Sequence, residues 1–404
     1  MLQVKPRHVP INLRQSGNSD ARMLISTRIR KSPYWHLSRR EGCWAYTVYN
    51  RTYHPRAYER PEDGGLMAEY ETLTKDVTMW DVAVERQIRV KGPDAAEFVD
   101  LLITRDVHTK LPVGQGRYVI LCDERGGIIN DPVLLRLAED EFWFSISDSD
   151  VLLWAKGVNA FSGHDVTIDE IDVAPIQIQG PKSKDLMTRL VGPELLELGY
   201  YRLMETRLDD LDVVISRTGF SGEVGYEIYL RDATLHSDKL WNRVLDAGQE
   251  FGLKVIAPSH VRRLEAGILS WGQDMDIETN PYEVGLGWQV DLGKEKFIGK
   301  EALARIKEEG VVQKLVGLRL GGKPITWYNE DFYLVKDSDG SEVGYISSAF
   351  WSPTFDTNIA LATLPTALAD PGTRLKAELP ADGLVDAEVV PVPFKDPDKE
   401  IPKS

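Results

Sequence analysis

Two acidic residues lie where the surrounding sequence predicts buried strands, and they are the first candidates for chemistry. Asn130 and Asp131 interrupt the apolar run GGIINDPVLL directly after a Gly-Gly turn. A buried carboxylate without a partner costs several kcal/mol or shifts its pKa upward, so a positive or hydrogen-bond-donating ligand would explain Asp131. The alternative is a β-turn or bulge in which the Asn-Asp pair caps backbone amides.

The second candidate lies in SRTGFSGEVGYEIYL, where Gly219, Gly222 and Gly225 lead into a strand that carries Glu227 and Tyr229. Both side chains point to one face because a strand repeats every two residues, and the glycines would let a flat ligand approach the backbone. A carboxylate there can accept two parallel N–H bonds from the edge of an amino-pyrimidine. The alternative is the polar, solvent-facing side of an edge strand.

A third segment, RRLEAGILSWGQDMDIETNPYEVGLGWQVDL, crowds polar side chains into a helix and a long loop. Loops that are this rich in polar side chains are often functional, but the side chains can also form hydrogen bonds and ion pairs with each other at a junction between domains. The polar side chains concerned are Arg262, Arg263, Trp271, Asp274, Glu278, Asn280 and Glu283.

Aromatic rings are dense near the start of the chain, in an otherwise irregular and basic stretch. Rings in this number must be buried, either against the core or in a wall that holds a flat ligand. They are Tyr34, Trp35, Trp44, Tyr46, Tyr49, Tyr53 and Tyr58.

Composition and charge exclude several classes of function. The chain of 404 residues has 48 Lys+Arg against 63 Asp+Glu, and its net charge of −15 repels nucleic acid and anionic lipid. There is no phosphate-loop, Rossmann, GxSxG or HExxH pattern, and the seven histidines are too scattered to predict a metal site. The charged start, MLQVKPRHVPINLRQSG, does not resemble a signal peptide, so we expect a cytoplasmic protein. Cys43 and Cys122 are expected to be buried thiols.

The hydrophobic pattern predicts an α+β chain. Two strand–Gly-Pro–helix units recur, QIRVKGPDAAEFVDLL and PIQIQGPKSKDLMTRLV, and Asp94 can cap the first helix. GRYVILCDERGGIINDPVLLRL and EFWFSIS predict antiparallel strands joined by hairpins. A later helix is expected to begin at a Ser237 cap and to end at Gly252. Residues 312–394 predict a closed or sandwiched β domain, and 395–404 a solvated tail.

Four longer phrases carry a family resemblance. RTGFSGEVGYEIYL, RLEAGILSWGQDMDIETNPYEVGLGW, FIGKEAL and GYISSAFWSPTFDTNIALA resemble the aminomethyltransferase family, typified by the glycine-cleavage T-protein. The resemblance implies a three-domain cloverleaf around a central hole that binds tetrahydrofolate, with a β-rich, barrel-like C-terminal domain. The implied parts are an aromatic-rich extension (1–45), a discontinuous α+β folate-binding domain (46–82 plus 170–272), a second α+β domain (83–169), the β-rich domain (273–394) and a tail (395–404).

The resemblance also implies one-carbon transfer between a substrate heteroatom and N5 of the folate. Asp131 falls on the family's catalytic aspartate, Glu227 on the carboxylate that grips the pterin edge, and Tyr118 on a tyrosine of the folate site. The further residues expected at the cofactor are Tyr229, Phe220 and Arg263. Those expected at the substrate are Trp44, Tyr46, Tyr49, His54, Tyr229, His260 and Trp271.

Departures from the family pattern bear on the substrate. Residues 83–85, Ala-Val-Glu, replace a Ser-His-Met triplet, and 258–260, Pro-Ser-His, replace a segment that carries a ligand-contacting arginine. Arg262 or Arg263 could compensate for that arginine. These changes disfavour glycine cleavage and a lipoyl carrier protein as partner. WDVAVERQ, GGIINDPV and DSDVLLWAKG resemble instead the tetrahydrofolate-dependent demethylase branch, most closely its dimethylsulfoniopropionate-demethylating members.

We therefore expect a methyltransferase that moves a methyl group from a small S- or O-methylated substrate to N5 of tetrahydrofolate, with a dimethylsulfoniopropionate-like donor favoured. Asp131 would stabilise positive charge at N5 and accept or relay its proton. A sulfonium leaves as a neutral sulfide and benefits from an aromatic cage. An aromatic methyl ether or methylenedioxy donor needs a proton donor, for which His36, His54, His260 or a tyrosine could serve. A non-catalytic folate-binding protein is the alternative of another class.

Overall fold

The computed structural model describes residues 25–404, which divide into two compact units. The two-sheet unit comprises Ile25–Val119, Asn130–Ser259 and Lys399–Ser404. The described part of the barrel unit comprises Ile120–Ile129 and His260–Asp398. Residues 1–24 of the expected aromatic-rich extension lie outside the described residues.

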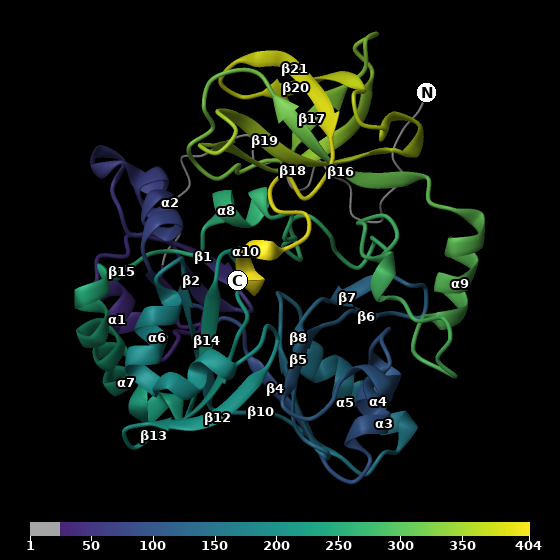
Figure 1. The fold of residues 1–404 in the computed structure, drawn as a ribbon. Helices are drawn as coiled ribbons and strands as arrows, with labels where there is room; N and C mark the ends of the chain where they lie inside the picture. The colour runs from purple at the N-terminus through teal and green to yellow at the C-terminus, as the bar shows by residue number, and fades with distance from the viewer. Residues whose placement is uncertain (1–24) are drawn as a thin grey trace. The chain divides into compact units, whose positions relative to one another are not determined.

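A six-stranded sheet forms one half of the two-sheet unit. Helices α6 (Ser183–Val191) and α7 (Ala233–Gly248) pack on it, and their apolar faces share one core with its strands (Figure 1). Leu186 and Met187 of the predicted stripe are fully buried in that core. The strand order is β12 (Leu203–Leu208), β13 (Leu211–Ser216), β14 (Gly225–Arg231), β11 (Val173–Gln179), β3 (Thr78–Asp81) and β15 (Lys254–Val255).

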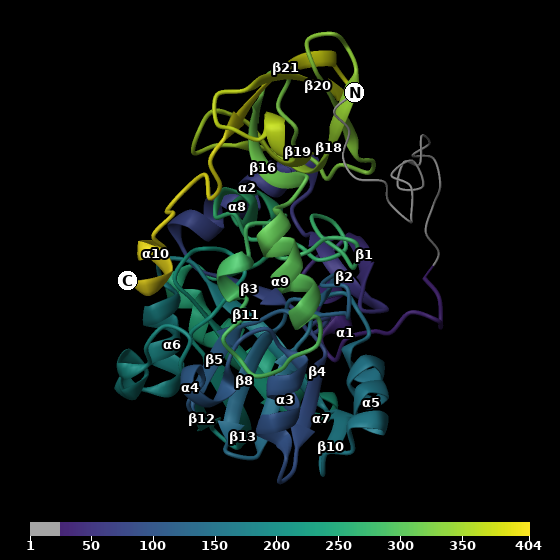
Figure 2. The same cartoon turned by 90° about the vertical axis from the view of Figure 1, so that its right-hand side faces the viewer.

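A five-stranded sheet forms the other half of the two-sheet unit. Helix α3 (Ala95–Leu102) lies beside this sheet (Figure 2), with α4 (Val107–Lys110) and α5 (Val151–Ser162) following in the chain. The strand order is β10 (Thr167–Glu170), β4 (Gln87–Lys91), β9 (Glu141–Ser145), β8 (Val133–Ala138) and β5 (Gln115–Tyr118). The predicted antiparallel pairing of the strands around 115–145 is confirmed.

The two sheets pack against each other through a small apolar cluster. Leu135 and Trp143 of the five-stranded sheet contact Val214 and Tyr229 of the six-stranded sheet. This contact brings β8 and β9 close to β14, although these strands are far apart in the sequence. Polar side chains at the edge of the cluster therefore come together from both sheets.

The start of the described chain adds a hairpin and two helices to the two-sheet unit. Strands β1 (Ala45–Tyr49) and β2 (Thr52–Ala57) pair with each other, between α1 (Trp35–Arg40) and α2 (Gly65–Lys75). Trp35 lies 4.6 Å from the Tyr46 ring and 5.0 Å from the Tyr53 ring, measured between centroids. Part of the aromatic stretch is therefore packing, as one of the two interpretations of the sequence predicts.

The barrel unit contains a closed six-stranded barrel, which confirms the predicted β-rich domain and the α+β fold class. The predicted Asp-Gly turn at 339–340 joins β17 (Tyr333–Lys336) to β18 (Glu342–Ser352), and the one at 382–383 joins β20 (Arg374–Leu379) to β21 (Gly383–Val390). The unit also holds β6 (Leu121–Cys122), most of β7 (Ile128–Asn130), α8 (His260–Glu265) and α9 (Lys300–Glu309). The barrel order is β16 (Gln313–Leu320), β19 (Thr357–Pro365), β18 (Glu342–Ser352), β17 (Tyr333–Lys336), β20 (Arg374–Leu379) and β21 (Gly383–Val390). The domain boundaries drawn from the sequence stay a prediction.

Two predicted helix caps are wrong. Asp94 precedes α3, but its carboxylate accepts a hydrogen bond from the Asp165 backbone N–H at 2.8 Å and caps no α3 amide. Ser237 is buried inside α7, which begins at Ala233. The apolar spacing continues for one turn before Ser237, so the first polar residue with capping chemistry is not the helix start. The expected end at Gly252 is confirmed, after a short 3-10 turn over Gln249–Phe251.

The end of the chain is also not a solvated tail. Residues Glu400–Lys403 form α10 in the two-sheet unit, and Pro402 is buried. The Pro402 carbonyl accepts a hydrogen bond from Arg217 at 3.5 Å, and Lys184 donates to the Ser404 carbonyl at 3.1 Å. The last residues are rich in charge, which is typical of a solvated tail. Their partners lie about 200 positions earlier in the chain, and the sequence does not show this. In the described part of the chain, no helix is both long and apolar enough to cross a membrane.

Glu69 of α2 ties three backbone segments together. Its Oε1 accepts hydrogen bonds from the Tyr58 and Glu59 amides at 2.7 and 3.0 Å, and its Oε2 accepts one from the Ala257 amide at 2.9 Å. The side chain is buried, and burial outweighs these three N–H groups to raise the pKa of Glu69 to about 7. Glu69 is therefore a structural carboxyl whose protonation is coupled to folding.

We expect Glu69→Gln to destabilise the protein and to change the pH dependence of its stability. The pKa of Glu69 is about 7 in the folded protein against the ordinary glutamate value of 4.5, so the folded state binds the proton more tightly. The wild-type free energy of unfolding should therefore fall as pH rises from about 4.5 to about 7, by at most about 3 kcal/mol. Glutamine has no such slope, but its amide N–H₂ faces a backbone donor, which costs about 1–3 kcal/mol. Urea unfolding at pH 5 and pH 8 measures both effects, and an equal difference between the two proteins at both pH values would contradict the coupling.

Candidate active site

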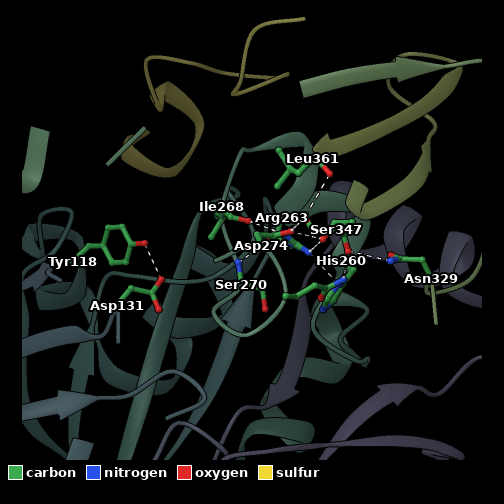
Figure 3. A network of polar contacts seen from close by, with 12 residues as sticks. Tyr118, Asp131, His260, Arg263, Ile268, Ser270, Asp274, Asn329, Ser347 and Leu361 are labelled. Carbon is green, nitrogen blue, oxygen red and sulfur yellow. Dashed lines mark hydrogen bonds and ion pairs between the residues drawn. The ribbon is translucent and has the colours of Figure 1, made fainter. Parts of the chain in front are cut away.

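Asp131 and Tyr118 form a hydrogen-bonded pair in the two-sheet unit. Asp131 lies just before β8 and is 7% exposed, and the Tyr118 hydroxyl donates to its Oδ2 at 2.8 Å (Figure 3). The pair forms because Tyr118 ends β5 opposite Val133 of β8. Burial, followed by the nearby Asp131 carboxyl, raises the pKa of Tyr118 well above its ordinary value. Tyr118 is therefore a neutral donor at physiological pH, and Asp131 is buried as the sequence predicts.

Asn130 fixes the chain on the other side of Asp131. Its side chain is fully buried, donating to the Ser147 carbonyl at 3.0 Å and to Ser149 Oγ at 2.8 Å. Its Oδ1 also accepts a hydrogen bond from the Ser147 amide at 3.0 Å. The two residues therefore have different roles, because Asn130 anchors the loop after β9 and Asp131 binds the Tyr118 hydroxyl.

Glu227 is the centre of a second buried cluster, on β14. Both Glu227 and Tyr229 are buried, at 2% and 0% exposed, which overturns the alternative of a solvent-facing edge. Gln177 Nε2 donates to Glu227 Oε1 at 2.6 Å, and the Tyr229 hydroxyl donates to Oε2 at 2.9 Å. The hydroxyls of Ser216 and Thr218 also donate to Oε2. Every one of these donors is neutral, so a buried carboxyl is held without a cation.

The glycines before β14 serve a purpose different from the predicted one. A Cβ added at Gly219 or Gly225 would lie 2.2 Å from the Gln179 side chain, so both glycines make room for that residue. Gln179 in turn donates to the Thr218 carbonyl at 3.2 Å and accepts from Ser221 Oγ at 2.6 Å. The missing side chains therefore accommodate a buried glutamine that supports the Glu227 cluster.

Glu85 belongs to the same region, although sequence reasoning did not place it among the site residues. Ser145 Oγ of β9 donates to Glu85 Oε2 at 3.0 Å. Burial, followed by the Glu227 carboxyl and, more weakly, Asp131, raises the pKa of Glu85 well above its ordinary value. The signal was present in the sequence, because Glu85 lies in the triplet that departs from the family pattern. Its proximity to Glu227 and Asp131 required the packing of the two sheets.

Tyr49 and His54 connect the N-terminal hairpin to this region. Their rings lie 5.8 Å apart, and burial together with Asp131 raises the pKa of Tyr49 above its ordinary value. His54 is 7% exposed, and its Nδ1 has no hydrogen-bond partner in the part of the chain that the structure describes. Burial, with a smaller contribution from Arg56, lowers the pKa of His54 well below its ordinary value. The imidazole is therefore neutral at physiological pH.

Three other predicted residues of the two-sheet unit have different surroundings. Trp44 donates through Nε1 to the Glu59 carbonyl at 3.1 Å and lies under the Arg60 guanidinium. Tyr46 packs on Trp35, and Phe220 is half-buried, with its amide 3.4 Å from Gln177 Oε1. Phe220 therefore adjoins the Glu227 cluster, whereas Trp44 and Tyr46 pack among residues of the N-terminal stretch.

The remaining predicted residues lie in the barrel unit, in a network that Figure 3 shows. Arg263 is fully buried, and it donates to Asp274 Oδ2 at 2.5 Å and to Ser348 Oγ at 2.7 Å. His260 Nδ1 lies 3.4 Å from Arg263 Nη2. Trp271 donates through Nε1 to the Ile128 carbonyl at 2.9 Å. Arg263 is thus held by Asp274, as the alternative of mutual satisfaction predicts, and its role at the cofactor stays a prediction.

The chemistry of the two-sheet cluster is that of carboxyls, phenols and amides. Among residues 25–404, no group of three or more His, Cys, Asp or Glu side chains is arranged to hold a metal ion. Buried acceptors that have only neutral donors suit an organic ligand rich in N–H groups. Together with the closed barrel, the fold and the site define an α+β protein whose buried carboxyls suit such an organic ligand.

Comparisons with known proteins identify the family to which the chain belongs. The chain matches the GCVT N-terminal domain over residues 36–294 and the glycine cleavage T-protein C-terminal barrel domain over residues 313–396. The chain therefore belongs to the glycine cleavage T-protein family. The family consists of tetrahydrofolate-binding enzymes, which confirms the predicted cofactor and the use of one-carbon units.

Three relatives illustrate the similarity. The chain is 35% identical over 364 residues to the dimethylsulfoniopropionate demethylase DmdA of Ruegeria pomeroyi, covering 90% of this chain and 97% of the relative. It is 37% identical over 340 residues to an aminomethyltransferase of Thermotoga maritima, covering 81% and 89%. The crystal structure of the glycine cleavage system aminomethyltransferase T from Bartonella henselae matches with a TM-score of 0.80 at 25% identity, covering 91% of this chain and 98% of that chain.

Proposed function

We propose that this protein is a tetrahydrofolate-dependent demethylase that moves a methyl group from a small sulfonium donor, such as dimethylsulfoniopropionate, to N5 of the folate. The observation that carries the choice of donor is that neither the buried phenols nor the neutral His54 imidazole is suited to donate a proton. Burial raises the pKa values of Tyr49, Tyr118 and Tyr229 and lowers that of His54. A sulfonium leaves as a neutral sulfide and needs no proton, whereas an aryl ether must be protonated as it leaves. The surroundings of Asp131 therefore favour the sulfonium.

The residues of the Glu227 cluster fit a pterin. Glu227 is buried with neutral donors only, and its hydroxyl partners can rotate to leave its lone pairs to other N–H groups. A pyrimidine edge with two N–H donors suits such a carboxylate, and Tyr229 and Gln177 would orient it. When bound, tetrahydrofolate supplies a nucleophilic nitrogen, N5, that accepts the methyl group.

In this proposal, Asp131 accepts a proton and stabilises positive charge. Its carboxylate would accept the proton that leaves N5, and its negative charge would favour the positive charge of the donor nearby. Tyr118 is a positioning residue, because its hydroxyl donates to Oδ2 and fixes the orientation of the carboxyl group. The similarity to the Ruegeria pomeroyi demethylase over 90% of the chain supports the same reaction class.

A donor panel tests the proposal. The purified protein is incubated with tetrahydrofolate and, separately, with dimethylsulfoniopropionate, methoxybenzoates, methylenedioxyarenes, or a carrier protein that already bears an aminomethyl-lipoyl group. We expect 5-methyltetrahydrofolate and a neutral sulfide in equal amounts from the sulfonium alone. Transfer from a methoxybenzoate would replace the sulfonium by the ether alternative, and methylenetetrahydrofolate and ammonia from the aminomethyl-lipoyl carrier would identify an aminomethyltransferase. No folate product from any donor would favour the non-catalytic folate-binding protein.

A further inference from the structure

The surroundings of Glu85 contain more hydrogen-bond acceptors than donors. Ser145 Oγ donates to Glu85 Oε2, and Gln87 Nε2 donates to Ser145 Oγ at 2.8 Å. Gln87 is fully buried, yet its Oε1 accepts no hydrogen bond within residues 25–404. A buried acceptor without a donor costs about 1–3 kcal/mol. This cluster therefore lacks a donor or a positive charge.

The two glutamates of this cluster, Glu85 and Glu227, have no positively charged partner among residues 25–404. Within the described chain, neither Glu85 nor Glu227 forms an ion pair, and the carboxyls that act on Glu85 are Glu227 of β14 and Asp131 before β8. The Glu85 charge also contributes to the raised pKa values of Tyr49 of β1 and Tyr229 of β14, and both side chains are neutral phenols. Ionising Glu85 beside two acids is unfavourable in the free protein, and a cationic ligand would reverse that balance.

We propose that Glu85 is a specificity-determining residue whose carboxylate recognises the positive charge of the methyl donor. The inference rests on the proposed function and deepens it, because it assigns Glu227 to the pterin and Glu85 to the sulfonium. Glu85 lies on the turn between β3 and β4, and Ser145 of β9 holds it in place. The same position carries an uncharged residue in the pattern from which this chain departs. Binding of a cationic donor then requires the ionised Glu85, so it releases a proton from the free protein.

Glu85→Gln tests this assignment through binding alone. The probes are dimethylsulfoniopropionate and 3-methylthiopropionate, which share a carboxylate and differ by one S-methyl group and by the positive charge on sulfur that it creates. We expect the wild type to bind the sulfonium roughly 10- to 100-fold more tightly than the sulfide, and the variant to bind both within about threefold. Tetrahydrofolate affinity should stay within about twofold. Glu141→Gln on β9 is the matched control, because it removes a carboxylate that is already paired with Lys91.

The pH dependence provides a second readout that needs no variant. Because the pKa of Glu85 is raised, sulfonium affinity of the wild type should increase as pH rises from 5 to 8, while sulfide affinity should not. Calorimetry in two buffers of different ionisation enthalpy should show the released proton. Unchanged discrimination in Glu85→Gln, loss of its tetrahydrofolate affinity, or a wild type that does not discriminate would overturn the inference. Discrimination without methyl transfer would instead contradict the proposed function and leave the role of Glu85 intact.

Discussion

Asp131→Asn should lower the turnover of methyl transfer by roughly 100- to 10,000-fold and leave tetrahydrofolate affinity within about threefold. Asparagine has the shape of aspartate and can still accept the Tyr118 hydrogen bond that now reaches Oδ2 at 2.8 Å. It carries no negative charge and cannot take up a proton at neutral pH. Single-turnover kinetics with saturating tetrahydrofolate and the active donor, together with a folate titration, separate the chemical step from binding.

Two further variants make the Asp131 result interpretable. Tyr118→Phe keeps the carboxylate and removes its donor, so we expect a smaller loss of about tenfold. Asp148→Asn removes a nearby carboxyl whose Oδ1 accepts a hydrogen bond from the Asn50 amide at 2.7 Å, and turnover should stay within about threefold. Full turnover in Asp131→Asn, with thermal unfolding unchanged, would show that this carboxyl has no part in the reaction.

Glu227→Gln should weaken tetrahydrofolate binding by roughly 10- to 100-fold, because a charge-assisted pair of hydrogen bonds becomes at best one neutral bond. Turnover at saturating tetrahydrofolate should change much less. The free protein should be as stable as the wild type or more stable, since the variant removes a buried charge that has only neutral donors. Equilibrium titration of tetrahydrofolate and thermal unfolding of the free protein measure the two effects.

The control for Glu227 is an exposed carboxylate on the same sheet. Glu205 of β12 pairs with Arg231 at the surface, so Glu205→Gln should leave tetrahydrofolate affinity unchanged. Equal affinity in Glu227→Gln and the wild type would place the pterin elsewhere. A variant that loses affinity and also unfolds at a lower temperature would indicate a structural role for the Glu227 cluster.

The comparison of sequence and structure is most instructive at the two predicted carboxyls. Asp131 and Glu227 could be found because each interrupts a pattern that is otherwise typical of a buried strand, and both are buried. The purpose of the glycines before β14 could not be found, because it depends on Gln179, a residue on the neighbouring strand β11. Local sequence shows that a side chain is missing, but it does not show which atom occupies the space.

Contacts between residues that are far apart in the sequence also explain where the predicted secondary structure differs from the observed one. The β-rich C-terminal domain was predictable because several of its strands follow each other in the sequence and are joined by turns with a strong signature, such as Asp339-Gly340. Its closure depends on pairings between non-consecutive strands, such as β16 with β21. The docked end of the chain was not, since α10 depends on contacts with Lys184 and Arg217. The chemistry of Ser237 suits a helix cap, but the structure buries this residue inside α7.

By itself, the sequence determined the α+β class, the C-terminal β domain and membership of a tetrahydrofolate-binding family, and it predicted the candidate site residues. These features follow from local periodicity and from long motifs that are read in order along the chain. Only the tertiary structure decided that Glu85 lies near Glu227 and Asp131, that Arg263 is held by Asp274, that the His54 imidazole is neutral, and that burial raises the pKa values of the Tyr49 and Tyr118 phenols. The physical reason is that burial and electrostatic proximity arise when distant strands pack together, and no spacing within one strand records them.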